Sequence, residues 1–170
     1  MPAASRWAIV CRRRHSRDSR RPRGHMKGVS PMLSQFPLYV DIPAADAIRA
    51  RRWYEERLGL TPLTEFQGVL LYMSGGVPFY LYETVAAGHA THTVASWIVE
   101  DIASLMEDLR FRGIDFENYD QGDSGPTTVN GVATGQDGAL AAWFKDSEGN
   151  VLGLVQLPPG MTLPGASLAS

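Results

Sequence analysis

The clearest pattern of apolar and polar positions lies near the C-terminal end of the chain. Apolar residues dominate positions 141–144 and 151–155, and a polar stretch separates them. Aromatic and β-branched side chains favour strands. The polar stretch holds the residue types that turns need: Asp146, Ser147, Gly149 and Asn150. The pattern predicts a β-hairpin over residues 141–156.

The segment 35–84 predicts a strand, a helix and three further strands. Apolar residues at helical spacing follow Asp46, which is a good N-cap, and Gly59 ends the helix. Alternating or β-branched runs mark the strands. The expected elements are a strand over 35–42, a helix over 46–58, and strands over 61–67, 69–73 and 79–83.

The same order then recurs. We expect a strand over 91–99, a helix that begins at Asp101 and ends at Gly113, a strand over 114–119, and the hairpin. One helix face carries Ile102, Leu105, Met106 and Leu109. The two N-cap aspartates are 55 residues apart and the two helix-ending glycines 54. This spacing indicates an internal repeat of a βαβββ unit.

The second unit is longer by about 19 residues, which we place between Asp120 and Ala139. Glycines are concentrated there, as expected of a long loop. A loop of this kind is either a functional lid or a surface excursion, and the sequence leaves both alternatives open.

Charge is distributed unevenly along the chain. Residues 1–31 hold nine of the 16 Lys and Arg residues and one acid, so residues 32–170 carry a formal charge of -10. This argues against nucleic acid as a partner of the folded part. The single cysteine, Cys11, excludes an internal disulfide, and no apolar run reaches the roughly 20 residues of a membrane helix. We therefore expect a cytoplasmic location and no membrane contact.

We expect three regions along the chain. Residues 1–33 are predicted to be a disordered Arg-rich extension: a nucleic-acid or membrane arm, a targeting peptide, or an extension without function, which we favour. Residues 34–157 are predicted to fold, with module one over 34–84 and module two over 91–157. Residues 158–170 are expected to be a flexible tail.

Several of these residues together resemble the vicinal oxygen chelate superfamily, which includes glyoxalase I, bleomycin and fosfomycin resistance proteins, and extradiol dioxygenases. The resemblance covers about residues 34–157. It implies an α+β fold in which two βαβββ modules form an incomplete barrel around a shared cleft, and it implies a homodimer. The residues that carry it are Asp46, Trp53-Tyr54, Leu58-Gly59-Leu60, Trp97-x-Val99-x-Asp101, Leu109, Gly113 and Phe144-x-Asp146-x-x-Gly149-Asn150.

Metal-binding members of the superfamily hold an ion at four inward-facing positions, generally His and Glu. The resemblance places these positions on Tyr39, Tyr80, Val94 and Gly153. Divalent ions need imidazole, carboxylate or thiolate donors, and none of the four residues is a usual ligand. We therefore expect no metal and no cofactor, with a divalent metal as the alternative.

The candidates for a ligand site are Tyr39, Tyr80, Tyr82, His92, Val94, Trp143, Phe144 and Gly153. Tyr39, Tyr80 and Tyr82 either line an aromatic pocket or pack in the core. One of Trp143 and Phe144 should contact the pocket, because they point to opposite faces, whereas Trp97 should face the helices.

A histidine and a carboxylate are the candidates for chemistry. His92 and Glu83 either form an acid/base pair or displaced metal site, or are an exposed histidine and a solvated carboxylate.

Three functions fit the sequence. The first is a metal-independent binding protein of the bleomycin-resistance type, with a small apolar or aromatic ligand between the modules. The second is a lyase, isomerase or dioxygenase that is either metal-dependent or assisted by His92 and Glu83. The third is a structural or regulatory module. The fold does not identify the ligand or a reaction.

Overall fold

The computed structural model describes residues 33–122 and 125–161. The chain divides into two units, Met1–Phe36 and Pro37–Ser170. The described part of the first is a 3-10 turn, η1 (Leu33–Gln35), closed by a 3.1 Å hydrogen bond from the Phe36 N–H to the Leu33 carbonyl. Residues 1–32 and 162–170 lie outside the described residues, and with them nearly all of the predicted extension and most of the predicted tail.

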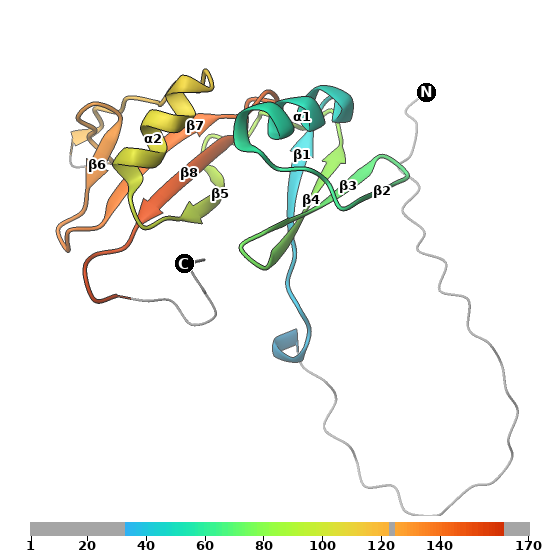
Figure 1. Ribbon diagram of the computed structural model, residues 1–170, viewed down its shortest axis with the longest axis horizontal. Helices are drawn as coiled ribbons and strands as arrows, with labels where there is room; N and C mark the ends of the chain where they lie inside the picture. Colours follow the sequence, from blue (N-terminus) through green and yellow to red (C-terminus); the bar gives the residue numbers. More distant parts are fainter. Residues whose placement is uncertain (1–32, 123–124, 162–170) are drawn as a thin grey trace, which may run out of the picture. The chain divides into compact units, whose positions relative to one another are not determined.

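Module one has the predicted βαβββ order (Figure 1). Its first strand begins later than the sequence indicated, at residue 40 instead of 35, and the other elements lie within three residues of their expected bounds. They are β1 (Val40–Ala44), α1 (Ala47–Trp53), a π-helical turn η2 (Tyr54–Leu58), β2 (Thr64–Phe66), β3 (Val69–Ser74) and β4 (Val77–Glu83).

The helix of module one begins and ends at the predicted residues. The Asp46 carboxylate accepts hydrogen bonds from the Ile48 and Arg49 N–H groups, at 3.0 and 2.9 Å, which satisfies two donors that a helix leaves unpaired. The chain leaves the helix at Gly59, whose φ of +69° favours glycine. Its last turn is π-helical, which the sequence did not indicate.

Module two repeats this order with β5 (Thr93–Ile98), α2 (Ile102–Phe111), β6 (Val132–Thr134), β7 (Leu140–Lys145) and β8 (Val151–Gln156). The strand predicted over 114–119 is wrong. Phe116 makes only an isolated bridge with Phe144, because β6 occupies the neighbouring edge of β7 from Leu140 to Ala142. The third element of this module is therefore β6, and the additional residues precede it.

The two sheets have equivalent topologies. Their strand orders are β1-β4-β3-β2 and β5-β8-β7-β6, and in each the first strand lies parallel to the last while the other pairs are antiparallel. This equivalence confirms the internal repeat and the α+β class.

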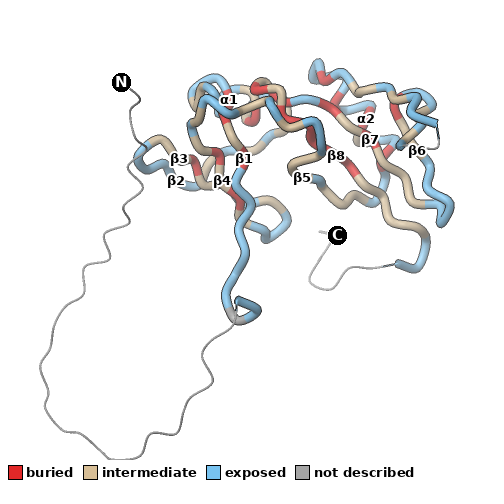
Figure 2. Tube along the Cα trace, turned by 180° about the vertical axis from the view of Figure 1, so that it is seen from behind, coloured by how far each residue is buried: buried red, intermediate tan, exposed pale blue. Residues whose placement is uncertain are grey.

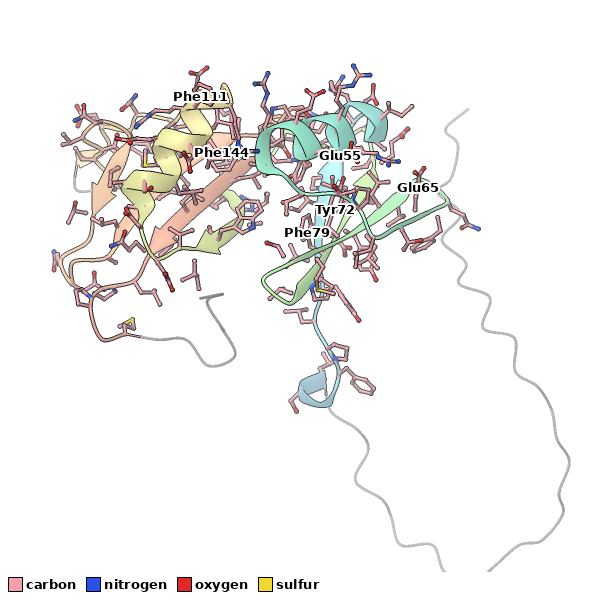
Figure 3. The ribbon with its side chains drawn as sticks, viewed as in Figure 1. Glu55, Glu65, Tyr72, Phe79, Phe111 and Phe144 are labelled. Atoms are coloured by element: carbon pink, nitrogen blue, oxygen red, sulfur yellow. The ribbon has the colours of Figure 1, made fainter. Side chains whose placement is uncertain are left out.

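Figure 2 shows where the buried positions lie along the trace. In each sheet the buried side chains lie on the face that packs against the helix. In module one the rings of Tyr54, Tyr72 and Phe79 meet there, with Tyr72 and Phe79 stacked at 5.1 Å (Figure 3). In module two the buried Phe144 ring stacks against Trp97 at 6.4 Å and against Trp53 of module one at 6.3 Å. One aromatic core therefore joins the modules, and Trp97 faces the helices as predicted.

The turn of the β7–β8 hairpin also joins the modules, through the buried side chain of Glu148. Its carboxylate accepts the Ala45 and Asp46 N–H groups at 2.7 and 3.0 Å. Arg49 donates through Nε at 2.8 Å and Nη2 at 2.7 Å, and the Ser147 hydroxyl donates at 2.9 Å. A glutamate in the first turn of a helix often accepts the N-cap N–H. In this helix Arg49 occupies that position, and Glu148 of module two accepts the hydrogen bond from the Asp46 N–H instead.

Asp146 and Asn150 complete the same turn. The Asp146 carboxylate accepts the Tyr54 hydroxyl at 3.0 Å and the Asn150 side-chain amide at 2.8 Å. That amide also donates to the Pro43 carbonyl at 2.7 Å, and its oxygen accepts the Gly88 N–H at 3.3 Å. The turn is thus bonded to β1, to the helix and to the segment between the modules.

The two carboxylates of the turn have opposite pKa shifts. Burial disfavours ionisation of Glu148, but the bonds from Arg49, Ser147 and the two backbone N–H groups outweigh it and lower its pKa. For Asp146, burial raises the pKa despite the hydrogen bonds that it accepts. Burial and the adjacent Asp146 raise the pKa of Tyr54 well above its ordinary range.

Glu148→Gln should lower the free energy of unfolding by about 2–3 kcal/mol at pH 7, because it removes charge-assisted bonds to buried or partly buried donors. Chemical denaturation measures the change. Glu117→Gln is the matched control, since Glu117 forms an exposed 3.4 Å ion pair with Lys145 and should cost at most about 0.5 kcal/mol. Equal costs would contradict the role assigned to Glu148.

The cost of Glu148→Gln should also depend on pH. Because folding lowers the pKa of Glu148, its contribution is fully present above the ordinary value of 4.5 and is lost as the pH falls through the folded value. The difference in unfolding free energy between the two proteins, measured from pH 7 to pH 3, should therefore shrink below about pH 4.5. A difference independent of pH would contradict the lowered pKa.

Candidate functional site

Each sheet has a second face, opposite its helix, which we call the outer face. It is the face on which Tyr39, Tyr80 and Gly153 lie, so it corresponds to the inward-facing positions of the expected cleft. In module one it is apolar and aromatic, with one charged side chain, Asp41. Several of its members are substantially exposed, among them Phe66 at 53%, Met73 at 44% and Tyr39 at 43%. By strand alternation and register, the outer face of module one comprises Tyr39, Asp41, Pro43, Thr64, Phe66, Val69, Leu71, Met73, Pro78, Tyr80 and Tyr82.

The three predicted tyrosines come together on this face. The Tyr39 and Tyr80 rings lie 5.5 Å apart with an interplanar angle of 59°. Tyr82 follows two residues along β4, on the same face, opposite Pro43. None of the three belongs to the buried core. Of the two alternatives, core packing is therefore wrong, and the rings are placed where a ligand could contact them.

Asp41 lies within this aromatic group. It is the register partner of Tyr80 on the parallel strand and shares its face with Tyr39. Its neighbours on β1, Ile42 and Ala44, are buried on the other side. Sequence reasoning missed Asp41, although its spacing of two residues from Tyr39 was a signal.

In module two, Ser96, Gly153 and Trp143 lie side by side on three adjacent strands of the outer face. A Cβ added at Gly153 would approach Ser96 Oγ to 2.7 Å and Thr93 Cγ2 to 3.4 Å. The Trp143 ring meets Tyr119, which precedes the glycine-rich segment, edge-to-face at 5.4 Å. The bare backbone of Gly153 is thus flanked by two hydroxyl-bearing residues and an indole.

A β-bulge changes the position of Val94. The register passes from Thr93 opposite Val151 to Ala95 opposite Leu152, which leaves Val94 as the additional residue. Val94 packs against the core, and Thr93 takes the place beside Gly153. The prediction of Val94 as an outer-face residue is therefore wrong, because counting along the strand assumed regular alternation. Thr93 was missed for the same reason, whereas regular alternation from Val94 already places Ser96 on this face.

Two further expectations are corrected. Phe144 is fully buried between Trp53 and Trp97, so Trp143 is the residue of that pair on the outer face. Glu83 shares the helix-covered face with Leu81, at the exposed end of β4. His92 is exposed just before β5. The proposed pairing of His92 with Glu83 has no geometric support among the described residues.

The residues at the four metal positions do not fit a divalent ion. They offer two phenols, a core-facing valine and a glycine, and the Ser96 hydroxyl crowds the space of a side chain at Gly153. Across the described ranges, no three His, Cys, Asp or Glu side chains are grouped so that they could hold a metal.

Known structures share this fold. A glyoxalase/bleomycin resistance protein of Catenulispora acidiphila DSM 44928 is 20% identical, with a TM-score of 0.52, over 71% of this chain and 97% of that one. Glyoxalase/bleomycin resistance protein/dioxygenase structures from Nocardioides and Alicyclobacillus acidocaldarius are 17% and 15% identical, with TM-scores of 0.53 and 0.55. The former match covers 82% of this chain and 91% of the other, and the latter 70% and 89%.

These matches confirm the predicted α+β fold of two βαβββ modules. At these identities the likeness concerns the fold alone. No protein-family model matches the sequence, and no curated protein sequence does either. Among the helices in the described part of the chain, none is long and apolar enough to cross a membrane.

Gly153→Ala should lower the free energy of unfolding by about 1–3 kcal/mol, because its methyl group would overlap Ser96 Oγ. In a Ser96→Ala background the nearest atoms are Thr93 Cγ2 at 3.4 Å and Cβ of residue 96 at 3.5 Å, which are ordinary van der Waals distances, so the cost should be clearly smaller. Denaturation of the four proteins in a double-mutant cycle measures the difference. An equal cost in both backgrounds would contradict the close contact.

Proposed function

We propose that this protein is a metal-independent binding protein that holds a small apolar or aromatic molecule between its two modules, against their outer faces. The observation that carries the proposal is the Tyr39–Tyr80 pair, partly exposed on an apolar sheet face instead of being buried in the core. Contiguous exposed apolar surface commonly marks a binding site.

The arrangement of the modules supports the same proposal. The first strands of the two modules, β1 and β5, contact each other. The Trp97 indole also donates a 3.0 Å hydrogen bond to the Ser74 hydroxyl at the end of β3. The tyrosines of module one and the Trp143–Gly153–Ser96 group of module two therefore belong to two sheets joined at these strands and through the buried hairpin turn. A ligand in contact with both faces would be enclosed on two sides.

The donor set favours binding without a metal. The positions at which metal-binding members of the superfamily carry His and Glu hold two tyrosines, a valine and a glycine in this chain. Bleomycin resistance is part of the names of the matched structures, and it reaches this chain only as the class of function that we propose. A homodimer and a cytoplasmic location are further parts of the proposal, taken from the resemblance and the composition.

Acridine, a planar aromatic probe, should bind the folded protein and raise its melting temperature in a thermal-shift assay. Fluorescence titration should show an affinity about 5–10-fold weaker for Tyr80→Ala, because stacking of aromatic rings contributes about 1 kcal/mol. Phe111→Ala is the matched control, since Phe111 is a 95% exposed aromatic residue on α2, and it should leave the affinity unchanged. Failure of acridine and related aromatic probes to bind, or an equal loss in both variants, would overturn the proposed site.

A further inference from the structure

We propose that the ligand of this site carries a positive charge: it is an apolar organic cation, of the quaternary ammonium or N-alkylated heteroaromatic class, with its charge held at Tyr39, Asp41 and Tyr80. This inference rests on the proposed function and adds the chemical class of the ligand. It comes from the distribution of charged side chains over the two faces of the sheets.

Basic side chains are absent from the outer face of module one. Residues 33–161 contain seven basic residues, of which six lie on the helical segments or end them, on the covered side: Arg49, Arg51, Arg52, Arg57, Arg110 and Arg112. The seventh, Lys145, ends β7 in module two and pairs with Glu117.

Most of the arginines are also bonded on the covered side. Arg49 binds Glu148, and Arg51 binds Glu55 at 3.0 Å and Glu65 at 3.4 Å. Arg110 donates to the Asn130 carbonyl at 2.9 Å, and Arg57 donates to the Arg112 carbonyl. These contacts hold the positive charge of the domain against its own carboxylates and carbonyls.

Asp41 differs from the carboxylates that pair with these arginines. It is the one charged side chain on the outer face of module one, it is exposed, and no ion pair is found for it within the described residues. Its neighbours Tyr39 and Tyr80 present aromatic rings. A carboxylate in an apolar patch without a cation leaves a local negative charge that a ligand can neutralise.

The chemistry of this group favours a cation over a neutral or negative molecule of the same shape. Aromatic faces attract positive charge through their quadrupoles. The carboxylate adds Coulomb attraction, and the formal charge of -10 over residues 32–170 adds a weaker field of the same sign. A primary ammonium would lose more hydration on the apolar face than a quaternary or delocalised cation, which explains the class that we infer.

The test uses three probes with one ring system: N-methylacridinium, acridine and acridine-9-carboxylate, which are positive, neutral and negative at pH 8. Fluorescence titration of the full chain at low salt should give an affinity about 5–10-fold higher for N-methylacridinium than for acridine, and the weakest binding for the carboxylate. Asp41→Asn should remove most of this preference, measured in each protein as the ratio of the N-methylacridinium and acridine affinities. The preference should also decrease with added salt.

Asp108→Asn is the matched control, because it removes the same charge from an exposed position on α2. It should preserve the preference. A preference lost equally in both variants would assign it to net charge and overturn the role of Asp41. Equal binding of the three probes, or tightest binding of the carboxylate, would overturn the inference while leaving the proposed function intact. If none of the three binds, the proposed function itself fails.

Discussion

The structure depends on one buried carboxylate. Glu148 is placed by the β7–β8 turn against the start of the helix in the other module, where it accepts five hydrogen bonds from Ala45, Asp46, Arg49 and Ser147. A buried charge is tolerated only when such partners compensate its lost hydration. The geometry that satisfies Glu148 therefore also sets how module one meets module two, and Asp146 and Asn150 reinforce it through Tyr54 and Pro43.

The strands of module one present different side chains to the buried core and to the outer face. Strand alternation sends Ile42 and Leu81 into the core and Asp41 and Tyr80 to the opposite side. Because the turn and the aromatic core already join the modules, the outer face is not needed for their association. Its Tyr39–Tyr80 pair and its single carboxylate lie on that face, where the proposed ligand would contact them.

Much of the fold could be predicted from the sequence, because its signals are local. The N-cap aspartates, Gly59 and Gly113 define the helix ends, and the repeat predicted two equivalent modules. Local signals could not show that residues 114–119 do not form a strand. Their alternation resembles that of a strand, but β6 competes for the same edge of β7, and competition between distant segments is a tertiary effect.

The sequence by itself determined the two modules and the hairpin, since these follow from residue types and short-range spacing. The tertiary structure decided which residues share the outer face. The bulge at Val94 interrupts the alternation of β5, so that Thr93 lies on the same face as Ser96, beside Gly153. Pairing of β1 with β4 brings Asp41 to Tyr80, about 40 residues away in the chain, because register and hydrogen bonding between strands bring distant residues together.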